Sequence, residues 1–172
     1  LSFSEYMKRS FFDKGGLSST RTTSLEAIIP NRAAGYVKTE NGLIQNATNY
    51  IALRPSGAFV SSINDLLNWE MAMQNNELLT QKSWKQMWDD KIKTPLTMDD
   101  EAVYYGYGWM VNTVNGKQLV HHGGSLPGFR SLYFRYPKDK TAIIVLSNLD
   151  STDTYAIAFG VAELLKVNSN QK

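Results

Sequence analysis

The residues best suited to chemistry lie in one segment, His121 to Phe129, which reads HHGGSLPGF. Neighbouring residues of a β-strand point to opposite faces, so only one of the two histidines can reach a given site. Glycine in a strand often marks close approach of a ligand or another backbone. A titratable side chain beside bare backbone N–H groups suits acyl transfer, which needs proton handling next to an oxyanion site. The pattern also fits a glycine-rich turn with two incidental histidines, and it leaves both interpretations open.

The segment and its surroundings resemble the C-type serine β-lactamases, the low-molecular-weight penicillin-binding proteins and their esterase relatives. The third active-site motif of that family is Lys or His, any residue, then Gly, and relatives often continue to Pro-Gly-Phe. His121-His122-Gly123, followed by Gly124 to Phe129, resembles this extended form. Further resemblances follow in the right order along the chain: Phe12 to Thr20, Gly57 to Leu66, Tyr105-Gly106-Tyr107-Gly108-Trp109, Tyr136 to Asp139 and Ile143 to Asn148.

The resemblance implies a serine hydrolase that forms an acyl-enzyme on an amide, β-lactam or ester. By this resemblance His121 and Gly124 are the catalytic residues: His121 faces the cleft and handles charge or protons, and the backbone N–H of Gly124 is an oxyanion donor. His122, Gly123 and Ser125 are the expected substrate-binding residues. The expected partner is a small-molecule or peptide acyl substrate, with no cofactor and no metal. The family also implies a periplasmic or extracytoplasmic location, although no signal peptide is visible.

Two motifs of the family are not found. No Ser-x-x-Lys nucleophile motif lies at a predicted helix start, and no tyrosine is followed two residues later by asparagine. Ser62-Ile63-Asn64 spells a Ser-x-Asn variant, but Ser62 is better read as a helix cap. We therefore predict that residues 1–172 form a single unit, the C-terminal part of a larger domain whose N-terminal part carries the nucleophile. The alternative is a non-catalytic binding or scaffolding module, and the N-terminal part of the same protein or a second copy could be a partner.

The elements that must position this segment are predicted from periodicity and turn signals. Ser2-Phe3-Ser4-Glu5 reads as a capping box that opens a short helix, and further helices are expected at 62–74, 80–89 and 151–167. Residues 17–60 are irregular, so they either hold short strands or line something functional. Strands are expected at 104–114, 119–122, 129–136 and 141–146, with a tight turn at Asn115-Gly116. The fold class is thus α/β (α+β), an antiparallel β-sheet with flanking helices.

Two of these elements carry more specific expectations. Thr141 to Leu146 is so apolar that we expect a central strand, covered on both faces. The last helix is apolar nearly all round, which predicts that it is buried. The four tryptophans are expected in the core, and Asp99-Asp100-Glu101 is expected to form a solvated turn.

Composition excludes several other classes. With 18 Lys and Arg against 16 Asp and Glu, the formal charge of +2 gives no support for nucleic-acid binding. There is no cysteine, so disulfides, thiolate catalysis and cysteine-bound zinc are excluded. No apolar stretch approaches the ~20 residues of a membrane helix. The histidine pair is not a convincing metal site, because its side chains diverge and no carboxylate stands at ligand spacing.

Overall fold

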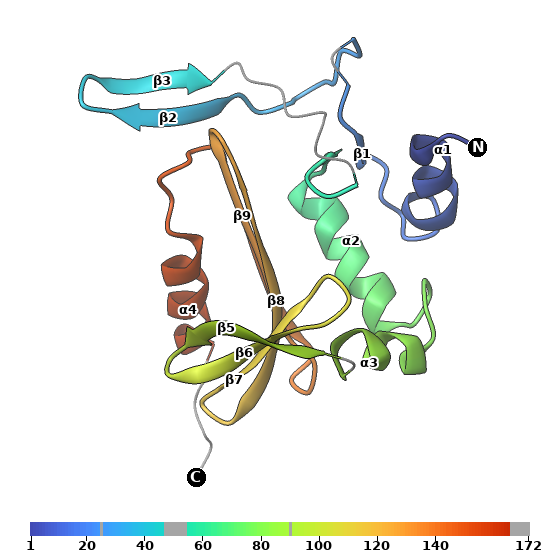
Figure 1. Ribbon diagram of the computed structural model, residues 1–172. Coiled ribbons are helices and arrows are strands. Elements are labelled where there is room, and N and C mark those ends of the chain that lie inside the picture. The colour runs from blue at the N-terminus through green and yellow to red at the C-terminus, as the bar shows by residue number, and fades with distance from the viewer. Residues whose placement is uncertain (25, 47–54, 90, 166–172) are drawn as a thin grey trace. The chain divides into compact units, whose positions relative to one another are not determined.

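The computed structural model describes residues 1–24, 26–46, 55–89 and 91–165 (Figure 1). The chain divides into two compact units, residues 1–78 with 124–130 and 146–152, and residues 79–123 with 131–145 and 153–172. Compactness does not establish independent folding, so the expectation of a single unit within a larger domain stays a prediction. The elements of the first unit are α1 (Phe3–Met7), a π-helical turn η1 (Lys8–Phe12), β1 (Arg21–Thr22), β2 (Gly35–Thr39), β3 (Gly42–Asn46), β4 (Phe59–Val60) and α2 (Ile63–Gln74).

The first two predicted helices begin at their caps. The Ser2 hydroxyl accepts a hydrogen bond from the Glu5 backbone N–H at 3.2 Å, and the Glu5 carboxylate accepts one from the Ser2 N–H at 2.7 Å. Ser62 caps α2 in the same way, accepting from the Asp65 N–H at 3.2 Å. Both caps satisfy backbone donors that a helix N-terminus leaves unpaired. The cap interpretation of Ser62 is therefore confirmed.

The irregular stretch 17–60 contains two short antiparallel pairs, β1 with β4 and β2 with β3. A buried carboxylate ties its start to α2: Asp65, 3% exposed, accepts hydrogen bonds from the Ser19 N–H at 2.8 Å and the Thr20 hydroxyl at 2.6 Å. The buried carboxylate of Asp65 thus has two hydrogen-bond donors. Short strands, one of the two alternatives for this stretch, are thus present.

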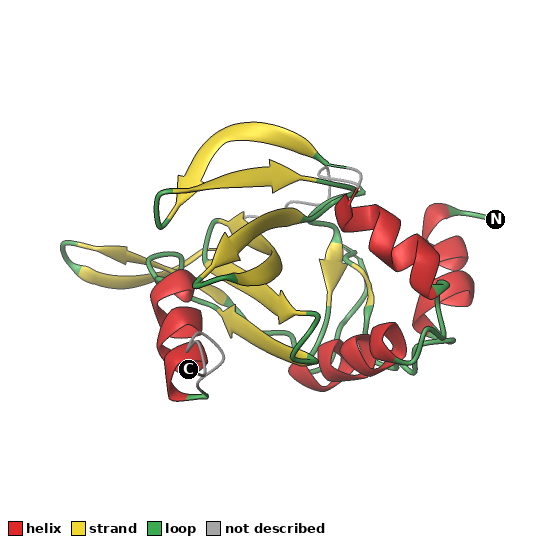
Figure 2. Ribbon diagram, turned by 90° about the horizontal axis from the view of Figure 1, so that it is seen from below, coloured by secondary structure: helices red, strands yellow, loops and turns green. Residues whose placement is uncertain are grey.

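The second part of the chain builds a six-stranded sheet in the order β10-β9-β8-β7-β6-β5. Its strands are among those drawn in yellow in Figure 2. Asn115 and Gly116 have φ of 50° and 76°, the left-handed values that a two-residue hairpin turn requires. This predicted turn is confirmed. Its elements are α3 (Gln81–Asp89), β5 (Ile92–Met98), β6 (Glu101–Tyr105), β7 (Met110–Val114), β8 (Lys117–Leu126), β9 (Phe129–Tyr136), β10 (Thr141–Ser147) and α4 (Thr154–Leu164).

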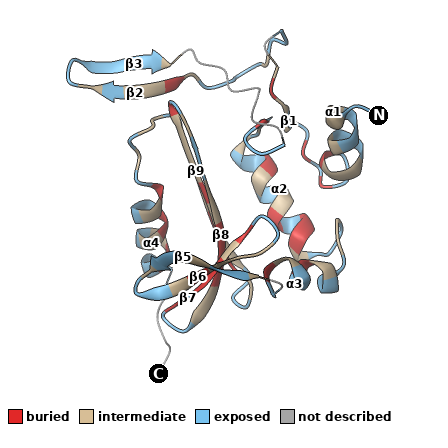
Figure 3. Cartoon of the chain, in the orientation of Figure 1, coloured by how far each residue is buried: buried red, intermediate tan, exposed pale blue. Residues whose placement is uncertain are grey.

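The two faces of the sheet are packed differently. On one face Leu119, Leu132 and Phe134 pack with Ala158 and Ala162 of α4. Figure 3 draws buried residues in red, and red segments lie on the sheet and on α4. On the other face the ring centroids of Trp109 and Tyr133 lie 5.6 Å apart, and the Arg135 guanidinium lies 5.5 Å from the centre of the Trp88 ring in α3. Trp84, Trp88 and Trp109 are buried, as predicted.

Three expectations need correction, and one strand, β5, was not expected. The predicted strand 104–114 is two strands, because Gly106 to Trp109 form a turn closed by the Gly106 N–H and the Trp109 carbonyl at 2.8 Å. β10 is the last strand of the sheet among the described residues, not a central one, because an apolar pattern reports covered faces and not the number of strand neighbours. In α4 Ala158 and Ala162 are buried against the core, with Tyr155, Phe159 and Val161 partly buried. Ile157 and Leu164 are 46% and 84% exposed, and Leu165, which follows the helix, is 57% exposed.

Candidate functional site

His121 lies on the packed face of β8. Its ring is fully buried, with centroids 5.5 Å from Phe134 and 6.0 Å from Tyr155, and neither ring nitrogen has a hydrogen-bond partner within the described part of the chain. Strand alternation explains this position, since His121 shares a face with Leu119, which packs against α4. The expectation that His121 points to an open face is therefore wrong.

The surroundings of His121 keep its ring neutral. Burial first, and the charge of the neighbouring His122 second, lower the pKa of His121 from 6.5 to about 4. A neutral imidazole enclosed by aromatic rings behaves as part of the hydrophobic core. Burial also raises the pKa of the Tyr155 hydroxyl that lines the same face.

Gly123 belongs to this packed face as well. A Cβ at Gly123 would stand 3.4 Å from the Tyr155 hydroxyl oxygen and 3.7 Å from a Leu132 methyl. These are ordinary contact distances, so Gly123 faces α4 and Leu132, and the expectation that it opens the strand to substrate does not match its position.

His122 points away from that core and is partly exposed. Its Nδ1 lies 2.7 Å from the Gly123 carbonyl oxygen, and its Nε2 lies 3.1 Å from the Tyr105 hydroxyl. The two rings meet edge to face, with centroids 5.9 Å apart. Because a carbonyl oxygen can only accept, Nδ1 carries the hydrogen of that bond. His122 therefore has both ring nitrogens engaged and its ring oriented.

The motif can be read one residue further on. His122-Gly123-Gly124 also satisfies the pattern of Lys or His, any residue, then Gly. Alternation alone does not choose between the two readings, because the strand has an apolar residue on each face, Leu119 with His121 and Val120 with His122. The sequence points to Tyr105 only as part of the Tyr-Gly-x-Gly-Trp motif, and this motif does not predict its contact with His122.

The turn after Tyr105 is anchored to α3. A Cβ at Gly106 would overlap the Met87 carbonyl oxygen, so only glycine fits there. The same carbonyl accepts the Tyr107 N–H at 2.9 Å. Gly108 has φ of 76°, which favours glycine. The end of β6 is thus held in place by backbone contacts.

The second half of the motif, Gly124 to Arg130, belongs to the first unit. Gly124 and Ser125 are exposed. The tip of the segment is held by the 17–60 stretch: Asn46 donates to the Pro127 carbonyl at 2.7 Å, and a Cβ at Gly128, where φ is 83°, would stand 2.8 Å from the Cα of Gly35. This segment is therefore an ordered turn whose first two residues, Gly124 and Ser125, are exposed.

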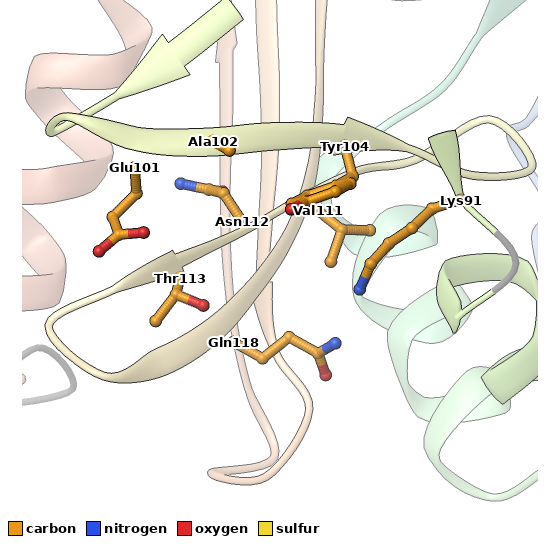
Figure 4. A pocket seen from close by; sticks show the side chains of 8 residues that line it. All are labelled: Lys91, Glu101, Ala102, Tyr104, Val111, Asn112, Thr113 and Gln118. Atoms are coloured by element: carbon orange, nitrogen blue, oxygen red, sulfur yellow. The ribbon is translucent and has the colours of Figure 1, made fainter. Parts of the chain in front are cut away.

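A hollow of about 240 Å³ lies elsewhere on the second unit (Figure 4). The ammonium group of Lys91 stands 5.4 Å from the centre of the Tyr104 ring. None of the five predicted site residues lines this hollow. Its lining residues are Lys91, Glu101, Ala102, Tyr104, Val111, Asn112, Thr113 and Gln118.

Neither a metal centre nor a membrane span is found in the described ranges. No three His, Cys, Asp or Glu side chains there are grouped so that they could hold a metal ion. None of the helices described has the length and apolar character to cross a membrane. The Ser-x-x-Lys spacing does occur once, at Ser169 to Lys172, after the last helix and outside the described residues.

Known proteins of similar sequence are longer than this chain. Penicillin-binding protein 4* of Bacillus subtilis is 25% identical over 171 residues, covering 90% of this chain and 37% of that protein. D-aminopeptidase of Gluconobacter oxydans is 23% identical, covering 96% of this chain and 31% of the enzyme. The chain thus spans about a third of the length of these two curated relatives.

Solved structures show the same fold over nearly the whole chain. The octameric penicillin-binding protein homologue from Pyrococcus abyssi aligns with a TM-score of 0.81 at 24% identity, over 96% of this chain and 38% of that one. D-amino acid amidase from Ochrobactrum anthropi, solved with L-phenylalanine, gives 0.76 at 18% identity, over 96% and 52%. The family model described as Beta-lactamase matches residues 1–165. The chain belongs to the Beta-lactamase family, and it has the fold of part of a penicillin-binding protein.

Proposed function

We propose that this chain is the C-terminal part of a serine hydrolase that cleaves an amide, β-lactam or ester through an acyl-enzyme, and that its His-x-Gly motif is His122-Gly123-Gly124. The observation that carries the proposal is the partial exposure of His122 together with its hydrogen bonds. His122 is the partly exposed histidine of the pair, and both its ring nitrogens are hydrogen-bonded. His121, in contrast, is enclosed by aromatic side chains.

The proposed reaction begins with a serine hydroxyl supplied from outside the described residues. Its oxygen bonds to the substrate carbonyl carbon, its proton passes to a base, and the carbonyl oxygen becomes an oxyanion. In this proposal the backbone N–H of Gly124, an exposed residue, donates to that oxyanion. The bond to the amine or alcohol then breaks, the leaving group takes up a proton, and water later releases the acyl group.

His122 handles charge beside the nucleophile in this proposal. As a neutral ring it carries hydrogen on Nδ1, so Nε2 is the nitrogen that can accept a proton. Strand alternation gives residues 122 and 124 the same side of β8. Ser125 is an exposed hydroxyl next to the proposed oxyanion donor and is proposed to contact substrate.

The test compares His122→Ala with His121→Ala in the intact protein, including its upstream part. Acylation is followed with a p-nitrophenyl ester and a chromogenic cephalosporin. His122→Ala should lower the acylation rate by about 10² to 10⁴, the usual loss when a proton-handling group is removed. His121→Ala should chiefly lower stability, and the folded fraction should retain its rate.

Two results would count against the proposal. One is an intact protein in which the His121 substitution is as damaging to acylation as the His122 substitution, once both are folded. The other is an intact protein that binds these compounds but is never acylated, which would favour a non-catalytic binding module.

A further inference from the structure

We infer that Tyr105 is a positioning residue that selects the tautomer of His122 and presents its Nε2. The inference rests on the proposed function, because it explains how the His122 ring is held for the role that the proposed function gives it. The hydroxyl of Tyr105 lies 3.1 Å from Nε2, and the phenol and imidazole rings meet at an interplanar angle of 73°.

The direction of this hydrogen bond follows from the other side of the ring. Nδ1 of His122 lies 2.7 Å from the Gly123 carbonyl oxygen, which can only accept, so Nδ1 is the protonated nitrogen. In the neutral ring Nε2 then has a lone pair and no hydrogen. The Tyr105 hydroxyl is the donor that meets this lone pair. Both partners therefore favour one tautomer.

Tyr105 stays bonded when His122 takes up a proton. The new hydrogen on Nε2 donates to the Tyr105 oxygen, and the phenol keeps its own hydrogen, which can turn toward another acceptor. One proton is gained in total, and it resides on Nε2. The bond reverses direction without moving the ring, so the orientation of His122 is preserved in both charge states.

The scaffold behind Tyr105 is rigid enough for this role. Tyr105 is the last residue of β6 and pairs with Met110 of β7, which pairs in turn with His121 of β8. The following Gly106 packs against the Met87 carbonyl, where any side chain would overlap. The Tyr-Gly-x-Gly-Trp motif therefore does more than turn the chain: it fixes the hydroxyl that meets His122.

The test uses Tyr105→Phe, which removes one oxygen, with Tyr107→Phe as the matched control. Tyr107 belongs to the same turn and is 59% exposed. The ring nitrogens of His122 are observed by ¹⁵N NMR in the full chain, and His122→Gln identifies their signals. In wild type the neutral ring should show a protonated Nδ1 and an unprotonated Nε2. Tyr105→Phe should shift the Nε2 signal and raise the population of the other tautomer, whereas Tyr107→Phe should leave both signals in place.

Acylation by the intact protein provides the second readout. Tyr105→Phe should lower the rate about 2- to 10-fold, the factor expected for one neutral hydrogen bond, and Tyr107→Phe should not. A wild-type ring protonated on Nε2, or Nε2 signals unchanged by Tyr105→Phe, would overturn the inference. If Tyr105→Phe alters the NMR signals but His122→Ala leaves acylation intact, the hydrogen bond stands and the proposed function fails.

Discussion

Replacing His121 by leucine should remove a large part of the acid sensitivity of the fold. In the folded chain burial lowers the pKa of His121 to about 4, whereas an unfolded chain has the ordinary value of 6.5. Between these values the unfolded chain binds more protons, so stability falls as the pH falls. The loss of stability caused by His121 is absent above the pKa of the unfolded chain, 6.5, and complete below the pKa of the folded chain, about 4.

The magnitude follows from the two pKa values. Each unit of difference corresponds to about 1.4 kcal/mol, so acidification from about pH 7.5 to about pH 4.5 should cost the wild type roughly 2 to 3 kcal/mol through His121 alone. His121→Leu should lose this contribution. At pH 7.5 it should be at least as stable as wild type, because the imidazole nitrogens it removes are buried and have no hydrogen-bond partner among the described residues.

Urea unfolding at both pH values measures the effect as the change in unfolding free energy. Carboxylates also titrate over this range, but they are present in every variant and cancel when variants are compared. His122→Leu is the matched control: it loses two hydrogen bonds and should keep most of the acid sensitivity, because burial is the larger cause of the lowered His121 pKa and His122 the smaller one. If His121→Leu keeps the full acid-induced loss, or His122→Leu abolishes it, the assignment of His121 to the core is wrong.

Two further predictions concern the isolated chain. It should not be labelled covalently by a fluorescent penicillin or a fluorophosphonate, because no Ser-x-x-Lys motif lies at the start of a helix that the structure describes. Stoichiometric labelling would reveal a missed nucleophile. Gly106→Ala should lower the unfolding free energy by about 1 to 3 kcal/mol, since its Cβ overlaps the Met87 carbonyl. Gly160→Ala should raise the unfolding free energy by about 0.5 to 1 kcal/mol, because Gly160 lies in α4 with open space around it. Thermal or urea unfolding measures both variants. A result in which Gly106→Ala is the more stable of the two would contradict the packing of these glycines.

The sequence alone determined the features that depend on neighbours along the chain. A cap needs a hydroxyl and a backbone N–H three residues apart, so Ser2 and Ser62 could be identified by spacing. The turn at Asn115-Gly116 needs two left-handed residues in succession, which these residue types favour. The candidate segment around His121 and His122 was located in the same way, from glycines and a motif pattern.

The tertiary structure decided which histidine faces which side. Strand alternation predicts that the two histidine rings point to opposite faces of β8. Only the position of α4 shows that the face with Leu119 and His121 is the one packed against this helix. The contact between Tyr105 and His122 joins residues 17 positions apart, through pairings of β6, β7 and β8 that no local pattern encodes. The position of β10 at the end of the described sheet is likewise a tertiary property. A strand's composition reports what covers its faces and not which strand lies beside it.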